Sequence, residues 1–270
     1  MGDSTIRFHK YEGLGNDFVV VELADERELP SARAAALCDR RYGVGADGVL
    51  LVLPSRAEGC DARMRVINAD GSISEMCGNG VRCVALHLAR AGGKPTGATE
   101  TVRIDTDAGT CACSVEDAKG EGIVTADMGV VRVLGERIVD VDGERVRLDL
   151  ADAGNPHAIL FGAFDRAEVE RLGPRLATHP DFPRGTNVEF ARVESGGIDL
   201  VVWERGVGVT LACGTGACAT AAVACAGGVM PLGVPIAVRL PGGRLDVTIH
   251  EDGRVTMRGP ARHVFSGVVG

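Results

Sequence analysis

The sequence contains no long apolar run and no excess of positive charge. No apolar stretch approaches the roughly 18 residues that a membrane-spanning helix needs. Residues 1–10 contain no apolar segment of the kind found in signal peptides. The formal net charge of −8 and the isoelectric point near 5.3 argue against non-specific binding to nucleic acid or to an anionic membrane. We therefore expect a cytoplasmic protein with no nucleic-acid and no membrane partner.

Several signatures of cofactor and metal chemistry are also missing. The pair Cys111-x-Cys113 does not have a zinc spacing, and no cluster of histidines and cysteines accompanies it. The stretches Gly43-x-Gly45 and Gly78-x-Gly80 lack the full dinucleotide fingerprint and its strand–helix setting. No lysine lies in a recognisable Schiff-base context. We expect no metal and no cofactor, and because nine cysteines is an odd number without a secretory signal, we expect free thiols.

One short stretch occurs twice. It reads Cys77-Gly78-Asn79-Gly80-Val81-Arg82-Cys83 in the first half and Cys213-Gly214-Thr215-Gly216-Ala217-Cys218 in the second. Each copy is followed by an apolar run, residues 81–91 and 217–226, which predicts a buried helix. A thiol at the start of a helix ionises easily, because the first N–H groups and the helix dipole stabilise negative charge.

Other landmarks repeat in the same order and at nearly the same offset. The offsets are 139 for Gly15-Asn16 and Gly154-Asn155, 140 for Asp47 and Asn187, and 136 both for Asn68 and Glu204 and for Cys77 and Cys213. Such a repeat predicts two similar α/β (α+β) domains in which several strands wrap around each cysteine helix. We expect an N-terminal domain over residues 1–118, joined by the last residues 262–270, and a C-terminal domain over residues 119–261.

Two further helices are predicted outside the repeated stretch. Residues 30–41 have Ala-rich helical spacing with Ser31 as the expected N-cap, and residues 165–177 have Asp165 as the expected N-cap. Short strands are expected throughout, the last of them over residues 255–258.

Two thiols at helix starts suit the inversion of a stereocentre. One thiolate removes a proton from a carbon atom, and the other thiol delivers a proton to the opposite face. The helix N–H groups at Gly78-Asn79 and Gly214-Thr215 can hold a carboxylate and stabilise the charge that develops beside it. His157 lies beside Asn155-Pro156 in the repeated turn, so a role in the site is favoured over a purely structural one.

At this point the residues resemble a known family. Gly13-Leu14-Gly15-Asn16-Asp17-Phe18, Asn68-Ala69-Asp70-Gly71-Ser72, both cysteine stretches, Gly154-Asn155-Pro156-His157, Asn187-Val188 and Glu204-Arg205-Gly206 are similar to the motifs of diaminopimelate epimerases. The resemblance runs in order over essentially the whole chain. It implies two pseudosymmetric domains, each with a barrel-like mixed sheet around a central helix, and a homodimer. It also implies cofactor-independent interconversion of LL- and meso-diaminopimelate, a step toward lysine and peptidoglycan.

The resemblance also assigns roles to single residues. It implies that Cys77 and Cys213 are the catalytic pair and that His157 and Glu204 tune the pKa of the thiols. The substrate-binding residues that it implies are Asn16, Asn68, Gly78, Asn79, Asn155, Asn187, Glu204, Arg205, Gly214 and Thr215. A substrate with an amino and a carboxylate group at both ends needs such a set of amides, one acid and one arginine.

Two other functions remain open from the sequence. The first is a racemase that acts on another amino acid, although proline-type relatives usually carry histidine where this chain has Asn79. The second is a catalytically silent binding module of the same fold, against which the retention of both cysteines argues. A redox role for Cys77 and Cys213 is disfavoured because they do not form a C-x-x-C pair.

Overall fold

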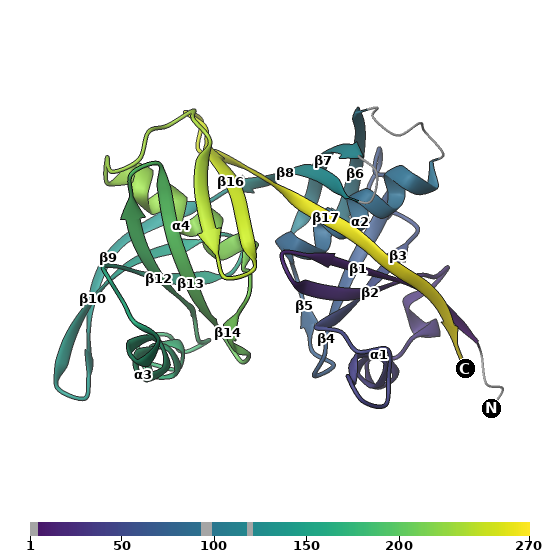
Figure 1. Ribbon diagram of the computed structural model, residues 1–270, viewed down its shortest axis with the longest axis horizontal. Helices are drawn as coiled ribbons and strands as arrows, with labels where there is room; N and C mark the ends of the chain where they lie inside the picture. The colour runs from purple at the N-terminus through teal and green to yellow at the C-terminus, as the bar shows by residue number, and fades with distance from the viewer. Residues whose placement is uncertain (1–4, 93–98, 118–120) are drawn as a thin grey trace. The chain divides into compact units, whose positions relative to one another are not determined.

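The computed structural model describes residues 5–92, 99–117 and 121–270, with its elements labelled in Figure 1. Contacts divide the chain into two compact units, Met1–Ala126 together with Gly259–Gly270, and Asp127–Arg258. We call these the first and the second unit. The domain boundary expected between residues 118 and 119 lies outside the described residues. The chain was expected to return to the first domain after residue 261, and the two units divide between Arg258 and Gly259.

The first unit is built mainly from residues before 127. Its elements are β1 (Ile6–Gly13), β2 (Asn16–Glu22), the 3-10 helix η1 (Glu26–Glu28), α1 (Ser31–Cys38), β3 (Gly48–Leu53), β4 (Ala62–Asn68), β5 (Ile73–Ser74), α2 (Gly78–Ala91), β6 (Thr99–Thr106) and β7 (Gly109–Asp117). Two strands continue from one unit into the other, β8 (Gly122–Val130) and β17 (Arg254–Val269).

The second unit follows the same plan. Its own elements are β9 (Arg132–Val141), β10 (Glu144–Asp152), β11 (Pro156–Phe161), α3 (Arg166–Ala177), β12 (Asn187–Glu194), β13 (Gly197–Glu204), β14 (Gly208–Thr210), α4 (Gly214–Ala226), β15 (Ile236–Leu240) and β16 (Gly243–Ile249).

Strand pairing repeats between the units, element by element. In the first unit β1–β2 is antiparallel, β2–β3 parallel, β3–β4 antiparallel, β4–β6 parallel, and β6–β7 and β7–β8 antiparallel. In the second unit β10–β11, β11–β12, β12–β13, β13–β15, β15–β16 and β16–β17 have the same sequence of directions. The short strands β5 and β14 each lead into a cysteine helix, so the sequence repeat is a repeat of topology.

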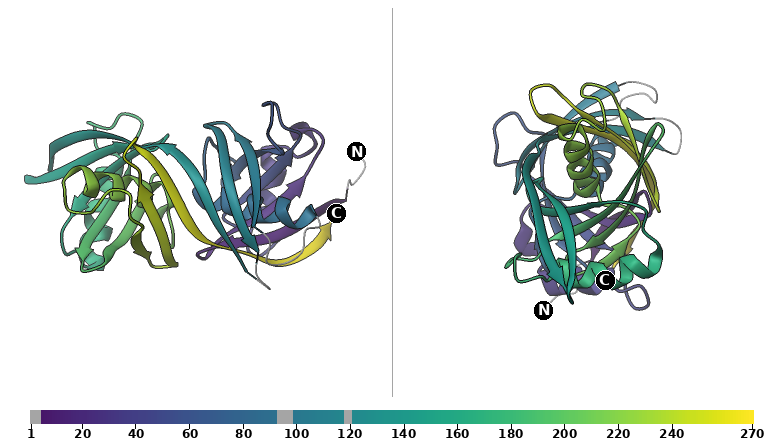
Figure 2. Two further views of the ribbon diagram at one scale, coloured as in Figure 1. Left: turned by 90° about the horizontal axis from the view of Figure 1, so that it is seen from above. Right: turned by 90° about the vertical axis from the view of Figure 1, so that its left-hand side faces the viewer.

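Each cysteine helix is the centre of its own unit. Helix α2 contacts β1, β2, β3, β4, β6 and β7, and α4 contacts the strands from β9 to β13 together with β15 and β16. The end-on view in Figure 2 shows α4 enclosed by strands. Helix α4 consists of Gly, Ala, Cys, Thr and Val, and twelve of its thirteen residues are buried, because small side chains let strands approach on every side. The expected fold, two domains each with a barrel-like mixed sheet around a central helix, is confirmed.

The other two α-helices, α1 and α3, pack against strands of their own units. Helix α1 packs on β3 and β4, and α3 packs on β9, β12, β13 and β14. Asp165 is confirmed as the N-cap of α3, where its side chain accepts a hydrogen bond from the Glu168 N–H. The expectation for α1 was wrong, because Pro30 is the N-cap and Ser31 is already helical. Within the described part of the chain, no helix is long and apolar enough to cross a membrane.

Candidate active site

Cys77 is the N-cap of α2. Its backbone is extended, with φ −140° and ψ 107°, and its Sγ accepts a hydrogen bond from the Gly80 N–H at 3.3 Å. A Cβ atom on Gly80 would lie 3.4 Å from this sulfur and 3.0 Å from Leu50 Cδ2, so glycine leaves room for the thiol. The sulfur therefore lies at the positive end of the helix dipole, where a thiolate is stabilised.

Two asparagines expected in the site are hydrogen-bonded beside Cys77. The Nδ2 atom of Asn79 donates to Oδ1 of Asn16 at 3.1 Å, and Nδ2 of Asn16 donates to Oδ2 of Asp47 at 2.7 Å. Asn79 belongs to the first turn of α2, and Asn16 is the first residue of β2. The hydrogen bonds thus fix both amide groups in one orientation.

A buried arginine supports the first turn of α2. The Arg82 side chain is fully buried in α2. Its guanidinium donates to Oδ1 of Asn79 at 2.9 Å, to the carbonyl of Gly78 at 3.2 Å and to the carbonyl of Pro260 at 3.1 Å. Two of these acceptors, the Gly78 carbonyl and the Asn79 amide, belong to the first turn of α2, so Arg82 holds this turn in place.

Asn68 lies at the end of β4, where it is paired in register with Gly48. Its Nδ2 atom donates to Ser72 Oγ at 2.9 Å. The carbonyl of Asp47 accepts a hydrogen bond from the Ala69 N–H at 3.1 Å, and the Asp47 carboxylate holds Asn16. Asp47 therefore joins the Asn68 turn to the Asn16 amide.

Cys213 repeats the geometry of Cys77 in the second unit. It is the N-cap of α4, with φ −127° and ψ 108°, and its Sγ accepts a hydrogen bond from the Gly216 N–H at 3.4 Å. The hydroxyl of Thr215 lies 3.6 Å from the same sulfur. Cys213 is buried, whereas Cys77 is partly exposed.

A line of hydrogen bonds runs from the Cys213 loop into the core of the second unit. Asn155 Nδ2 donates to Thr215 Oγ1 at 3.4 Å, His157 Nε2 lies 2.8 Å from Asn155 Oδ1, and His157 Nδ1 lies 2.7 Å from Glu189 Oε1. Because Asn155 Oδ1 is an acceptor, this network assigns a hydrogen to His157 Nε2.

The remaining predicted residues lie at the ends of β12 and β13. Oδ1 of Asn187 accepts a hydrogen bond from the Arg205 N–H at 2.9 Å, and Oε1 of Glu204 accepts one from the Thr210 hydroxyl at 2.6 Å. The Arg205 guanidinium donates to the carbonyl of Arg184 at 2.7 Å. Asn187, Glu204 and Arg205 therefore form one cluster that is held by backbone and side-chain contacts.

The electrostatic surroundings of Cys213 favour the protonated thiol. Burial raises its pKa well above the ordinary value, and the negative charges of Glu204 and Glu189 raise it further. The hydrogen bonds from Thr215 and from the Gly216 N–H act in the opposite direction. The charge of Glu204 therefore acts on the thiol of Cys213 and raises its pKa.

Sequence reasoning did not assign Arg82, Asp47 or Glu189 to the site. Arg82 and Glu189 each stand alone as a charged residue in a run that is otherwise apolar, and both side chains are fully buried. A lone charge in a buried helix or strand needs a specific partner, and this signal could have found both residues. Asp47 served only as a landmark of the repeat.

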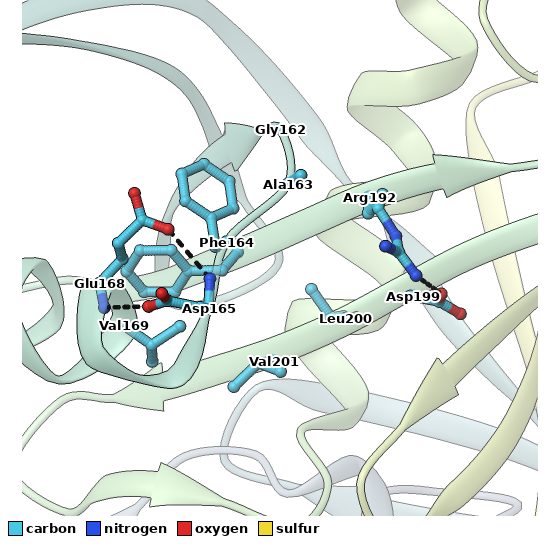
Figure 3. Close-up of a pocket in the computed structure, with 11 residues that line it drawn as sticks. Gly162, Ala163, Phe164, Asp165, Glu168, Val169, Arg192, Asp199, Leu200 and Val201 are labelled. Carbon is cyan, nitrogen blue, oxygen red and sulfur yellow. Dashed lines mark hydrogen bonds and ion pairs between the residues drawn. The ribbon is translucent and has the colours of Figure 1, made fainter.

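The pocket drawn in Figure 3 lies elsewhere in the second unit. It has a volume of about 430 Å³, and no predicted site residue lines it. Its charged side chains have partners: Asp165 and Glu168 cap α3, and Arg192 donates to Asp199 at 3.1 Å. The pocket therefore offers no unpaired group for the chemistry that the cysteines suggest.

Solved structures share this fold at low sequence identity. A hydroxyproline epimerase from Agrobacterium vitis superposes with a TM-score of 0.76 and 19% identity, covering 99% of this chain and 93% of that one. A probable proline racemase from Agrobacterium radiobacter K84 gives a TM-score of 0.73 and 18% identity, covering 98% and 92%. The architecture is thus that of two-domain epimerases and racemases.

Sequence relatives define the family within this class. The family model described as diaminopimelate epimerase matches residues 8–134 and 150–264. The chain is 42% identical to the diaminopimelate epimerase of Synechococcus sp. (strain JA-3-3Ab) over 288 residues, or 98% of each chain. It is also 42% identical to that of Desulfitobacterium hafniense over 284 residues, or 96% of each. The chain belongs to the diaminopimelate epimerase family, and it is an isomerase.

Proposed function

We propose that the chain interconverts LL-2,6-diaminopimelate and meso-2,6-diaminopimelate by passing an α-proton between two thiols. The observation that carries the proposal is that Cys77 and Cys213 cap equivalent helices in equivalent units. One sulfur, as thiolate, removes the proton, and the other, as thiol, delivers a proton to the opposite face of the carbon. Because the two thiols supply both the base and the acid, the reaction needs no cofactor.

The helix starts are proposed to bind the carboxylate at the reacting carbon. Gly78 and Asn79 form the first turn of α2, and Gly214 and Thr215 form that of α4. N–H groups in a first turn point along the helix axis toward an anion, and the dipole favours negative charge there. As the α-proton leaves, charge moves onto this carboxylate, so the same groups stabilise the transition state more than the substrate.

The other end of the substrate carries a second amino and a second carboxylate group. We assign its recognition to the amides, the acid and the arginine that the sequence predicted, namely Asn16, Asn68, Asn155, Asn187, Glu204 and Arg205. Amide groups can accept from an ammonium group and donate to a carboxylate, and Arg205 supplies a charged fork for the carboxylate. A simple amino acid would leave this set without a partner, which is how a site of this kind selects a longer substrate.

His157 and Glu204 are proposed to tune the thiol of Cys213. Glu204 acts through its charge, which raises the pKa of Cys213. His157 acts through position, since its ring holds Asn155, and Asn155 holds the Thr215 hydroxyl beside the sulfur. We further propose that the protein acts in the cytoplasm as a homodimer, in the synthesis of lysine and of the peptidoglycan precursor.

Deuterium exchange tests the proposed substrate. LL-diaminopimelate incubated with the protein in heavy water should gain α-deuterium as the meso isomer appears. Exchange with another amino acid, and none with diaminopimelate, would replace the proposal with a different racemase. No exchange with any amino acid would leave a binding module.

Single substitutions test the two-thiol mechanism. Cys77→Ala and Cys213→Ala should each abolish epimerisation, whereas Cys83→Ala, which removes a buried thiol nearly two turns further along α2, should retain it. Full epimerase activity in either of the first two variants would refute the mechanism.

A further inference from the structure

A cluster of histidines lies in the first unit, apart from the catalytic cysteine. His9 is on β1, Glu22 ends β2, and His87 lies in the second half of α2. One ring nitrogen of each histidine and one carboxylate oxygen of Glu22 all lie within 4.8 Å of one another. His87 is ten residues after Cys77, which corresponds to about 15 Å along the helix axis. The cluster is therefore separate from the site proposed for the epimerase reaction.

We propose that His9, Glu22 and His87 bind one divalent transition-metal ion of the zinc type. Two imidazoles and one carboxylate are a ligand set typical of Zn²⁺, with a fourth position for water. Tetrahedral ligands at about 2.0–2.2 Å from the ion lie a little over 3 Å apart. The His87 Nε2 and Glu22 Oε1 atoms are 2.8 Å apart, so the ion needs only a small opening between them.

The second nitrogen of each histidine is already held by a hydroxyl group. His9 Nδ1 lies 2.7 Å from Ser266 Oγ, and His87 Nδ1 lies 3.2 Å from the Tyr11 hydroxyl. These contacts assign Nε2 of each ring to the metal, because an Nδ1–H group can then donate to the hydroxyl oxygen. Metal-binding histidines almost always have such a partner, which fixes the ring and its tautomer.

Other groups lie around the cluster. His263 faces it from β17, where its Nε2 atom lies 2.9 Å from the same Ser266 hydroxyl. The Glu22 side chain is 60% exposed and can rotate onto an ion that enters from solvent, whereas His87 is 6% exposed and fixed.

A bound ion would join three elements of the first unit. It would link β1 and β2 to the half of α2 that lies away from Cys77, while the strand pairing of β1 with β17 carries Ser266 into the same site (Figure 1). Because the ion binds only the folded chain, it should raise the melting temperature.

Cobalt titration tests the site, because Co²⁺ replaces Zn²⁺ and its spectrum reports the ligands. The reduced full-length protein should bind one Co²⁺ per chain, with visible d–d bands and without the near-ultraviolet band of thiolate-to-cobalt charge transfer. His9→Asn and Glu22→Gln should each weaken binding by at least tenfold, roughly the loss seen when a metal site loses a supporting group. His179→Asn, in the second unit, is the matched control and should bind like the wild type.

Glu22→Gln also gives a readout in thermal melting. Glutamine can keep the hydrogen bond to His87 but removes the anionic ligand, so Zn²⁺ should raise the melting temperature of the wild type and not that of this variant. The proposal is overturned by the absence of Co²⁺ binding, by equal binding in the His9 and Glu22 variants, or by a dominant thiolate charge-transfer band. In those cases Glu22 is only a hydrogen-bond partner of His87, or the metal binds to the cysteines.

Discussion

Replacement of Arg82 tests whether a buried cation builds the first turn of the cysteine helix. Arg82→Met keeps most of the length and apolar volume of the side chain but removes all donors, and Arg82→Lys keeps the charge but loses the planar fork. The acceptors that Arg82 satisfies include Asn79 Oδ1 and the carbonyls of Gly78 and Pro260. No water can replace the guanidinium without rearrangement, since the side chain is fully buried.

The expected loss of stability follows from these acceptors. An orphaned buried hydrogen-bonding group costs about 1–3 kcal/mol, so three of them cost on the order of 3–9 kcal/mol. Removing the buried charge offsets part of this loss of stability, because the guanidinium no longer has to be desolvated on folding. We expect Arg82→Met to lower the free energy of unfolding by about 3 kcal/mol and Arg82→Lys by about 2 kcal/mol.

Urea unfolding followed by circular dichroism measures the change in stability. The matched control is Arg166→Met, which removes an arginine whose side chain is 90% exposed at the start of α3, and which should barely change stability. The Arg82 variants should also raise the KM for diaminopimelate more than the control variant does, because the Asn79 amide loses the guanidinium that orients it. An Arg82→Met variant that is as stable as Arg166→Met would refute the reasoning.

Three further predictions concern the thiols. Glu204→Gln should lower the pKa of Cys213, and Thr215→Val should raise it. The pH midpoint for alkylation of the Cys213 peptide, measured by mass spectrometry, should therefore move down in the first variant and up in the second; a move in the same direction in both would contradict the assignment. Gly216→Ala should destabilise the fold by about 1–3 kcal/mol, measured in urea, because the new Cβ would lie 2.8 Å from a buried carboxylate oxygen and 3.2 Å from the sulfur; unchanged stability would count against this packing. Burial raises the pKa of Cys38 from 9.0 to about 11, so the neutral thiol contributes its full stability below pH 9 and loses it as the pH rises toward 11. Between pH 9 and pH 11 the melting temperature of the wild type should fall more steeply than that of Cys38→Ala, and equal slopes would refute this prediction.

The central helices were predictable because their signals are local. A cysteine, a glycine turn and an apolar run lie within a few residues of each other, and they identified both helices. Each helix nevertheless begins earlier than expected, at Gly78 and Gly214 rather than at residues 81 and 217. The glycine turns are themselves the first helical turns, with the cysteines as N-caps.

Strand β9 was missed because its alternation is confined to one end. Residues 132–138 are exposed, including Leu134 at 61% and Ile138 at 53%, and only Val139 and Val141 are buried in the core. Two buried positions are too few to reveal a strand by alternation, and β9 is stabilised by its pairing with β10. Strand β17 was expected only over residues 255–258 but continues to Val269, because it pairs first with β16 and then with β1.

The buried charges of the site show a different limit of sequence reasoning. Arg82 meets the carbonyl of Pro260, which is 178 residues away, and Glu189 meets His157 from a neighbouring parallel strand. A sequence can show that such a charge needs a partner, but only the packing of distant segments identifies it. The roles of the asparagines came from motif resemblance, and the structure adds the hydrogen bonds that orient them.

The two halves of the proposed site are unequal in a way that bears on the order of proton transfer. The first turn beside Cys77 is supported by the cation Arg82, whereas Cys213 is buried beside the anions Glu204 and Glu189. Burial and negative charge both raise the pKa of Cys213, so this sulfur holds its proton at neutral pH. In the proposed mechanism Cys213 would then be the proton donor at rest, and the reaction direction that uses it as the base would first have to remove that proton. That direction should therefore show the steeper rise of kcat/KM with increasing pH.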